Sequence, residues 1–189
     1  MSTSAVLLAG GKSRRMGQDK AMILFRNTPL WQIQLDLLRK LQSQEIFVSA
    51  QIDPLWRPAD VEFVPDDRPS RGPLSGIAAA LSRITSDHLL ALAIDMPFMT
   101  AGYLRALCKQ VQPGRGVVPL IERRAEPLAA IYPREAHDDA TAALSSNDFA
   151  LQSLVGKLIA AGKLQPIPVL DEEKAFFRNL NNPGDLGRG

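Results

Sequence analysis

A segment near the N-terminus combines glycines with positive charge in a pattern that suits a polyphosphate ligand. Residues 8–20, LAGGKSRRMGQDK, hold three glycines and four cationic side chains directly after a short apolar run. Glycines let backbone N–H groups approach phosphate oxygens, and lysine or arginine neutralises charge on a phosphorus atom under attack. The segment therefore predicts a phosphate-binding loop, with a solvated basic turn as the alternative.

The spacing within this segment excludes two common nucleotide-binding loops. Residues 11–13, GKS, look like the end of a kinase-type phosphate loop, but Val6 occupies the position where that loop requires its first glycine. The three glycines also lack the G-x-G-x-x-G spacing of dinucleotide-binding folds. The sequence therefore indicates neither an ordinary P-loop kinase nor a nicotinamide-dependent dehydrogenase.

A second candidate group is the carboxylate of Asp95, which follows the apolar run 89–94 and precedes Met96 and Pro97. A residue in that position emerges at the carboxyl edge of a parallel sheet, where the glycine segment also opens. Magnesium is commonly held by one or two carboxylates together with substrate phosphates. We therefore expect Asp95 to bind Mg²⁺, and the alternative is an aspartate that caps a helix or stabilises a turn.

Asp66 and Asp67 follow another strand-like run, 61–65, and precede the turn at 71–76. A carboxylate at that place can contact a nucleobase or a ribose. A polar turn built from aspartate, proline and glycine explains the same residues equally well.

The elements that position these groups alternate between strand-like and helix-like patterns. Strands are expected at 5–8, 45–50, 61–64, 89–94, 116–121, 128–132 and 165–169, and helices at 30–41, 74–84, 102–111, 135–144 and 150–161. The strands are apolar throughout, which is typical of a mainly parallel sheet covered by helices on both faces. We therefore predict a single α/β domain, 1–189, with three α/β/α layers and its ligand beyond the carboxyl ends of the strands.

Composition excludes several classes of protein. The 189 residues carry 22 basic and 20 acidic side chains, which is too small an excess to indicate nucleic-acid binding. No apolar run approaches the ~20 residues that span a membrane, and the N-terminus lacks the features of an export signal. The single cysteine, Cys108, excludes an internal disulfide and a cysteine metal cluster, which fits a reducing cytoplasm.

Several residues are assigned structural roles on their local pattern. Cys108 is expected in a helix core, and Trp31 and Trp56 are expected to pack. A solvated mixed-charge turn is expected from Glu122, Arg123, Arg124 and Glu126. Residues 171–174, DEEK, are expected to form an exposed loop.

Three motifs together resemble the molybdenum cofactor guanylyltransferases. They are the segment 8–20, DMPF at 95–98 and NLNNP at 179–183, and the resemblance spans nearly the whole chain. The resemblance implies a Rossmann-like fold of the nucleotide-diphospho-sugar transferase type. It also implies transfer of GMP from GTP to the terminal phosphate of molybdopterin or its molybdenum-loaded form, with release of pyrophosphate.

The resemblance implies roles for particular residues. GTP would contact the strand end and loop together with more distant side chains, namely Leu8, Ala9, Gly10, Gly11, Lys20, Ser49, Asp66 and Asp95. Asp95 would also hold Mg²⁺, Arg15 would act as a transition-state cation, and Asn179 and Asn181 would line the acceptor pocket. The nucleophile is itself an anionic phosphate, so the chemistry needs no Ser-His-Asp relay.

Some positions depart from the family pattern and leave alternatives open. Ser49 stands where an asparagine on the guanine side is expected, and Asn182 and Gly184 replace a threonine and an acidic residue. Gly10 favours guanine, because related cytidylyltransferases have alanine there. The resemblance also implies that the cofactor is handed over among other cofactor-biosynthesis proteins. The rival hypotheses are a cytidylyl or sugar-phosphate nucleotidyltransferase, and a non-catalytic nucleotide-binding regulator or chaperone. Retention of both Lys20 and Asp95 argues against the last.

Overall fold

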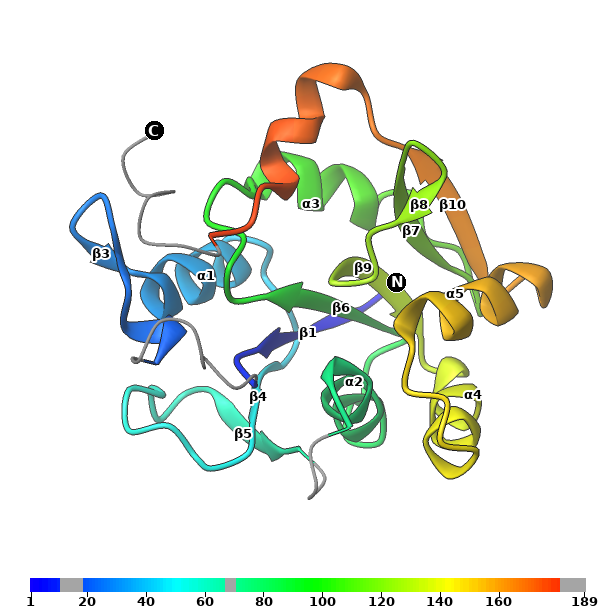
Figure 1. The fold of residues 1–189 in the computed structure, drawn as a ribbon, viewed down its shortest axis with the longest axis horizontal. Coiled ribbons are helices and arrows are strands. Elements are labelled where there is room, and N and C mark those ends of the chain that lie inside the picture. The colour runs from blue at the N-terminus through cyan, green and yellow to red at the C-terminus, as the bar shows by residue number, and fades with distance from the viewer. Residues whose placement is uncertain (11–18, 67–70, 181–189) are drawn as a thin grey trace.

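The computed structural model describes residues 1–10, 19–66 and 71–180, and its frame is one mixed β-sheet (Figure 1). Strand β1 (Thr3–Leu8) pairs in parallel with both β4 (Ile46–Ala50) and β6 (His88–Ala93). The strand order is β10 (Leu164–Pro168), β7 (Gly116–Ile121), β9 (Ala129–Pro133), β6, β1, β4 and β5 (Glu62–Pro65), with β8 (Arg124–Ala125) paired to β7. Because β1, β4, β5 and β6 run parallel, the residues that follow them meet at one edge.

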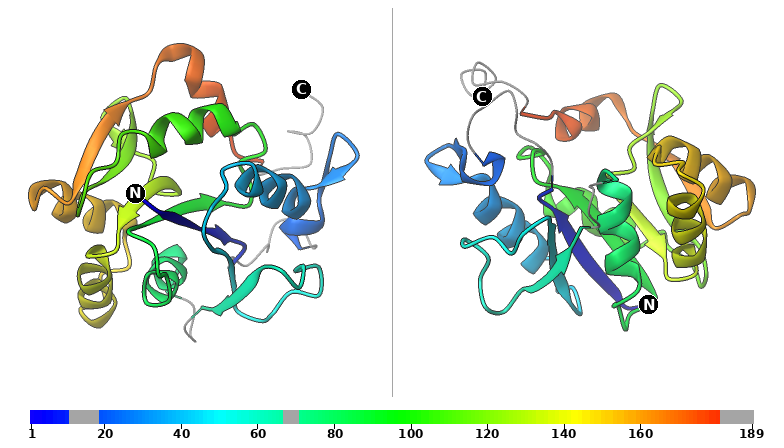
Figure 2. Two further views of the ribbon diagram at one scale, coloured as in Figure 1. Left: turned by 180° about the vertical axis from the view of Figure 1, so that it is seen from behind. Right: turned by 60° about the horizontal axis from the view of Figure 1, so that its bottom comes forward.

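Helices cover both faces of this sheet (Figure 2). One face packs against α1 (Leu30–Arg39) and α3 (Ala101–Cys108), and the other against α2 (Pro73–Leu81), α4 (Ala136–Ser145) and α5 (Leu151–Ala160). Side chains of β1 alternate between the two cores, with Ala5 and Leu7 on the first face and Val6 and Leu8 on the second. The predicted three-layer α/β/α arrangement is confirmed.

The apolar strands are explained by this double cover. Every residue of β6, HLLALA, is buried, and in β1 the last five residues are buried. A strand with helices on both faces has no solvent-facing side, so it does not alternate between apolar and polar residues. The sheet departs from parallel order at β9, which runs antiparallel to β6 and β7.

Two small hairpins are not among the predicted strands, because their shorter arms are only two residues long. Strands β2 (Leu24–Phe25) and β3 (Thr28–Pro29) are joined by Arg26 and Asn27, with φ of 50° and 63°. Strands β7 and β8 are joined by Glu122 and Arg123, with φ of 49° and 68°. Positive φ at both central residues marks a tight hairpin turn that glycine or asparagine normally signals.

The prediction of an exposed loop at 171–174 is wrong, because this segment begins a 3-10 helix, η2 (Asp171–Phe177). Its acidic first turn suits the positive end of a helix dipole, and the Glu173 carboxylate accepts a hydrogen bond from the Leu170 backbone N–H at 3.1 Å. Phe177 at its far end is buried and packs edge-on against Tyr103, with ring centroids 5.3 Å apart. The helix thereby fixes where the following residues run.

Other predicted elements agree within a few residues. Helix α1 is shorter than its apolar spacing indicates, since it ends at Arg39 and Leu41 lies in the following turn. Cys108 is half-buried against the core, as expected, and burial raises the pKa of its thiol. Among the described helices, none combines the length and apolar character that crossing a lipid bilayer requires.

Candidate active site

The centre of the candidate site is an ion pair between Lys20 and Asp95. Lys20 opens a short 3-10 helix, η1 (Lys20–Met22), and its Nζ donates to Asp95 Oδ2 at 2.7 Å. The two side chains are 25% and 19% exposed, so a ligand in solution can reach both. The prediction that Asp95 emerges beside the glycine-bearing segment is confirmed.

The Asp95 turn is held from several sides. The Ile94 N–H donates to the Leu8 carbonyl at 3.2 Å, and the Leu180 N–H donates to the Asp95 carbonyl at 2.9 Å. The ring of Phe98 contacts Phe25 edge-on at 5.1 Å, and the Arg178 guanidinium lies 5.1 Å from the Phe98 ring centre. The carboxylate is therefore presented by a backbone joined to β1, to the β2–β3 hairpin and to the segment after η2.

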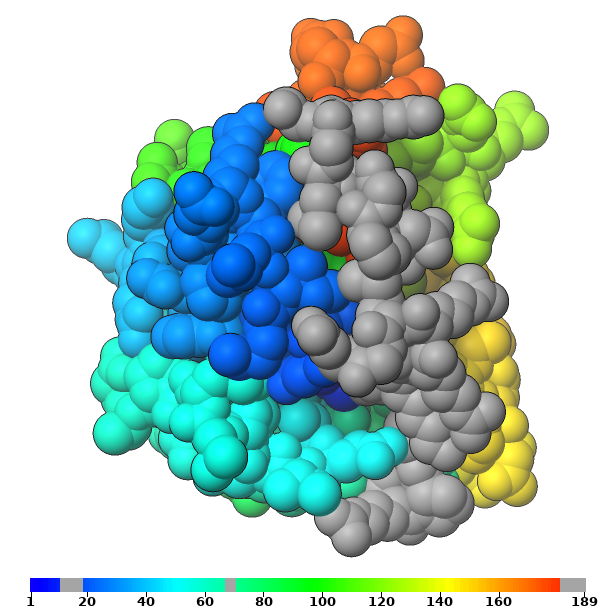
Figure 3. Space-filling view, turned by 60° about the vertical axis from the view of Figure 1, so that its left-hand side comes forward, coloured from blue at the N-terminus to red at the C-terminus, as the bar shows by residue number. Residues whose placement is uncertain are grey.

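The opposite partner, Lys20, is positioned by a chain of side-chain contacts. Asp19 caps η1 by accepting from the Ala21 N–H at 3.0 Å, and its second oxygen accepts from Trp56 Nε1 at 3.1 Å. Trp56 stacks on Trp31 of α1 with ring centroids 5.7 Å apart. These contacts join the segments drawn in blue and cyan on one face of the molecule (Figure 3). The packing role predicted for the two tryptophans is confirmed, and it extends to the placement of Lys20.

A second group, the Asp66 corner, comprises Gly10, Ser49, Asp66 and Gly76. Ser49 lies in β4 directly before its last residue, Ala50, is fully buried, and donates a hydrogen bond from its hydroxyl to Asp66 Oδ1. A side chain at Gly10 would collide with Asp66 Oδ2, and one at Gly76 would collide with the Ser49 hydroxyl. Glycine is therefore required at both positions because the carboxylate lies against the backbone. Because Ser49 is fully buried, its hydroxyl contacts Asp66 and does not face solvent.

The two groups share the carboxyl edge of the sheet. The Ala9 N–H donates to the Ser49 carbonyl and the Asp66 N–H donates to the Ala50 carbonyl, both at 2.9 Å, which aligns the ends of β1, β4 and β5. Leu8 is buried at the end of β1 and directly precedes Ala9 and Gly10. The predicted site residues Gly11, Arg15 and Asn181, together with Asp67, lie outside the described residues.

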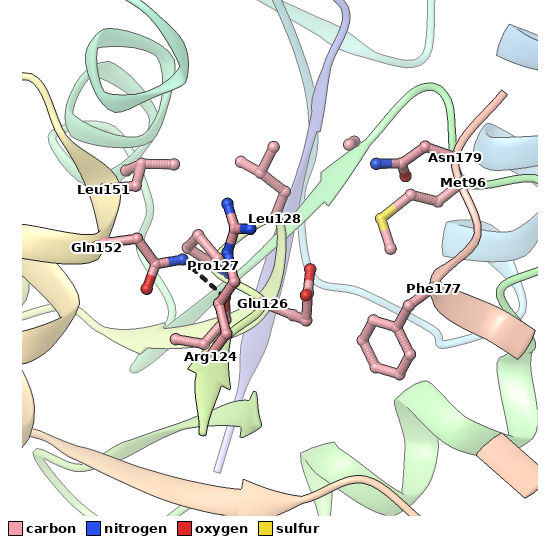
Figure 4. A pocket seen from close by; sticks show the side chains of 11 residues that line it. Met96, Arg124, Glu126, Pro127, Leu128, Leu151, Gln152, Phe177 and Asn179 are labelled. Atoms are coloured by element: carbon pink, nitrogen blue, oxygen red, sulfur yellow. Dashed lines mark hydrogen bonds between the residues drawn. The ribbon is translucent and has the colours of Figure 1, made fainter. Parts of the chain in front are cut away.

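Beside Asp95 lies a third feature, the Glu126 pocket, with a volume of about 340 Å³. Its walls come from the end of β6, the β8–β9 connection, the start of α5 and the segment after η2 (Figure 4). The lining residues are Ala93, Met96, Arg124, Ala125, Glu126, Pro127, Leu128, Leu151, Gln152, Phe177 and Asn179. Asn179 therefore lines this pocket, and its contact with the acceptor stays a prediction.

The sequence predicts the charges of the Glu126 pocket in a solvated turn, and the structure places them at a pocket wall. Arg124, expected in a plain solvated turn, lies at the pocket wall together with Glu126. Burial raises the pKa of Glu126, and the nearby Arg124 guanidinium acts in the opposite direction. Gln152 Nε2 donates to the Ala125 carbonyl at 2.8 Å and ties α5 to this connection. The only local signal is a polar hairpin followed by Pro127, which does not distinguish a pocket wall from a surface turn.

The described residues offer limited metal ligation on their own. No group of three or more histidine, cysteine, aspartate or glutamate side chains that could hold a metal occurs within 1–10, 19–66 and 71–180. Asp95 supplies one hard carboxylate next to a lysine. This donor set suits magnesium only where other ligands come from a polyphosphate and water.

Strand β1 is followed closely by Gly10, and the same sheet edge carries a lysine–aspartate pair and a buried aspartate, an arrangement that suits a nucleotide ligand. The family model of the MobA-like NTP transferase domain matches residues 5–161. The chain is 32% identical over 188 residues to a probable molybdenum cofactor guanylyltransferase of Opitutus terrae, covering 98% of this chain and 93% of that protein.

Solved structures agree with this match. Molybdopterin-guanine dinucleotide biosynthesis protein A from Archaeoglobus fulgidus superposes with a TM-score of 0.79 at 25% identity, covering 98% of this chain and 95% of that one. A 2-C-methyl-D-erythritol 4-phosphate cytidylyltransferase from Thermus thermophilus shares the fold, with a TM-score of 0.70 at 15% identity over 96% and 94% of the two chains. The chain belongs to the MobA-like nucleotidyltransferases, in the molybdenum cofactor guanylyltransferase family.

Proposed function

We propose that this protein transfers GMP from GTP to the terminal phosphate of molybdopterin or of its molybdenum-loaded form and releases pyrophosphate. The observation that carries the proposal is the Lys20–Asp95 pair, which lies between the Asp66 corner and the Glu126 pocket. Such a position suits the reacting phosphates of two ligands that enter from different sides. The relatives named as molybdenum cofactor guanylyltransferases support this choice of substrates.

The proposed reaction is a displacement at phosphorus. An oxygen of the acceptor phosphate forms a bond to the α-phosphorus of GTP, and the bond from that phosphorus to the bridging oxygen breaks, so that pyrophosphate departs with its electron pair. The acceptor phosphate is already anionic at neutral pH, so no general base is required. Lys20 neutralises charge on the triphosphate and orients it for in-line attack.

Asp95 is the residue that we propose to hold Mg²⁺ when GTP is bound. The single carboxylate fits an ion that takes most of its ligands from phosphate and water. The bound ion would neutralise phosphate charge and help orient the triphosphate. Binding requires that Lys20 release part of its contact with Asp95, and the arriving phosphates offer Lys20 an equivalent anionic partner.

The Asp66 corner is proposed to receive the nucleoside. Asp66 is 8% exposed and accepts a hydrogen bond from Ser49, so its carboxylate is held at the edge where a base or a ribose would bind. Gly10 supports this role because its missing side chain lets the Asp66 carboxylate lie against the end of β1. Guanine is the proposed base on the family match, and cytosine is the specific alternative. A cytoplasmic location and contacts with other cofactor-biosynthesis proteins stay predictions.

The proposal is tested by pyrophosphate release from the purified protein with Mg²⁺ and molybdopterin, run in parallel with GTP, CTP, ATP and UTP. We expect release with GTP alone. Release with CTP alone would keep the chemistry and replace the base. Absence of release with all four nucleotides, together with retained GTP binding, would replace the enzyme by a nucleotide-binding regulator or by a transferase with another acceptor such as a sugar phosphate.

A further inference from the structure

The Glu126 pocket contains a carboxylate in an unusual setting. Glu126 is half-buried, and several of its neighbours at the pocket wall are apolar, including Met96, Leu128 and Phe177. Within the part of the chain that the structure describes, its carboxylate makes no hydrogen bond or ion pair. A partly desolvated carboxylate without such a partner costs free energy, and a ligand that brings N–H donors relieves that cost.

The pocket also leads to the reacting centre. Met96 directly follows Asp95 in the chain, and Asn179 directly precedes Leu180, whose N–H donates to the Asp95 carbonyl at 2.9 Å. Figure 4 shows the Glu126 carboxylate projecting into the space that Met96, Phe177 and Asn179 close from the other side. A ligand seated there extends its far end toward Lys20 and Asp95.

We propose that the Glu126 pocket holds the pterin ring of the acceptor, and that Glu126 accepts hydrogen bonds from its N–H and amino group. The proposal rests on the function proposed above and assigns a residue that sets acceptor specificity. A pterin carries a flat ring with an N–H and an amino group side by side, which match the two oxygens of one carboxylate. Its phosphate is carried on a side arm, so the ring and the reacting end can occupy neighbouring subsites.

Neighbouring residues support Glu126 in this role. Arg124 places positive charge at the same wall and favours the ionised carboxylate that accepts both hydrogen bonds. Gln152 uses its amide to hold the Ala125 carbonyl, so it braces the connection that carries Glu126. The pocket volume of about 340 Å³ lies in the range of small-molecule sites, and its apolar residues suit the faces of a heterocycle.

Guanine presents the same pair of donors as a pterin, so the two ligands must be told apart by position. The Asp66 corner follows β1, β4 and β5, whereas the Glu126 pocket lies on the side of β6 that pairs with β9. Asp66 and Glu126 thus lie on opposite sides of Asp95, and each carboxylate accepts hydrogen bonds from a similar ring edge, that of guanine or that of the pterin. Loss of Glu126 should affect the acceptor and spare the nucleotide.

The test compares Glu126→Gln with Glu122→Gln, a change of the same kind in the preceding hairpin turn. Glu122 is 80% exposed and only pairs with Lys174, so it controls for loss of charge near the pocket. We expect E126Q to raise the KM for molybdopterin about tenfold or more, since a charge-assisted pair of hydrogen bonds is lost. The KM for GTP should stay within about twofold in both variants, and E122Q should match the wild type.

A nucleotide-free measurement separates this inference from the proposed function. Binding of free pterin is followed by its own fluorescence, and we expect binding by the wild type and E122Q and loss of binding by E126Q. An unchanged molybdopterin KM in E126Q, or an equal rise in the GTP KM, would overturn the inference while transfer remained intact. If the wild type releases no pyrophosphate, the proposed function fails, and pterin binding alone then decides whether the pocket assignment stands. Equal thermal unfolding midpoints for the three proteins establish that folding is unaffected.

Discussion

The Asp66 corner and the Glu126 pocket flank the same Asp95 but are built in opposite ways. In the Asp66 corner, Ser49 and Asp66 are buried, bonded to each other and backed by glycines. In the Glu126 pocket, Arg124 and Asn179 are exposed, and the Glu126 carboxylate has no hydrogen bond or ion pair within the described residues. The Asp66 corner is preorganised on parallel strands, whereas few contacts hold the side chains of the Glu126 pocket.

The difference follows from the elements that carry each site. Ends of adjacent parallel strands are fixed by the sheet ladder, so side chains just beyond them have little freedom. The Glu126 pocket draws on a hairpin connection, the first turn of α5 and the segment after η2, which are joined by few contacts such as the Gln152–Ala125 hydrogen bond. A transferase can thus bind one ligand rigidly and fit the other as it arrives.

Substitution of Asp95, which lies between the two sites, should have the largest effect on turnover. Asp95→Ala deletes the carboxylate that we assign to Mg²⁺ and to orientation of the triphosphate, and turnover should fall by ~10³-fold or more. The fold should survive, because the side chain is 19% exposed and the turn is held through backbone groups. Pyrophosphate release measures the loss, with Asp36→Ala on the exposed face of α1 as control. Near-normal turnover in D95A would remove Asp95 from the reaction.

The rigidity of the Asp66 corner is tested by Gly10→Ala. The added methyl group collides with Asp66, so the carboxylate must move and the KM for GTP should rise by ~10- to 100-fold. Molybdopterin KM should change much less, because the Glu126 pocket does not include this residue.

Gly156→Ala is the matched control for that substitution. A side chain there meets nothing within 4 Å, and the position lies inside α5. The change should leave the GTP KM unaltered and raise the free energy of unfolding by about 0.5–1 kcal/mol, measured by denaturant titration. A GTP KM that is equally insensitive to G10A would show that the corner is not preorganised around Asp66.

The edge formed by the parallel strands could be predicted from the sequence, whereas the Glu126 pocket could not. The apolar runs of β1 and β6 and the position of Asp95 directly after β6 are local patterns, so they place the reacting edge correctly. Proximity of Lys20 to Asp95 follows from strand order, although the two residues are 75 positions apart.

The Glu126 pocket is hidden from sequence because it is assembled from four distant segments. A turn is predicted around Glu122 and Arg123, but their positive φ without glycine hides the tight hairpin that pairs β7 with β8. The local pattern therefore predicts that Arg124 lies on a solvated surface turn. Only the pairing of β7 with β8 and the helix η2 bring these segments around one space.

Acidity should distinguish the two sites by a smaller margin. Burial raises the pKa of Glu126, so its ionised fraction falls earlier than that of an ordinary carboxyl as the pH is lowered. Arg124, the other charged side chain of the lining, acts on the pKa of Glu126 in the opposite direction. The KM for molybdopterin should therefore rise several-fold on acidification.

Glu126→Gln provides the baseline for this pH profile. The acceptor phosphate itself titrates near ~6 and contributes to every variant alike, so the relevant quantity is the ratio of the molybdopterin KM values of E126Q and the wild type. That ratio should shrink as the pH falls, because the wild type loses the ionised carboxylate that the variant already lacks. A ratio independent of pH would show that Glu126 does not bind the acceptor in its ionised form.

The smallest expected effect concerns the support beneath Lys20. Trp56→Phe keeps an aromatic ring over Trp31 but removes the N–H that donates to Asp19, the cap of η1. Loss of one such hydrogen bond corresponds to about 0.5–1 kcal/mol, so kcat should fall about two- to fivefold.

Trp31→Phe is the matched partner, because within the described residues its indole N–H has no hydrogen-bond partner. It alters the same ring stack without touching the Asp19 contact, and its kcat should stay near that of the wild type. If both variants slow the reaction equally, the stacked rings rather than the Asp19 hydrogen bond hold Lys20 in place. If W56F alone is slow, the rigid side of the site extends from the Asp66 corner to the lysine, and flexibility is confined to the Glu126 pocket.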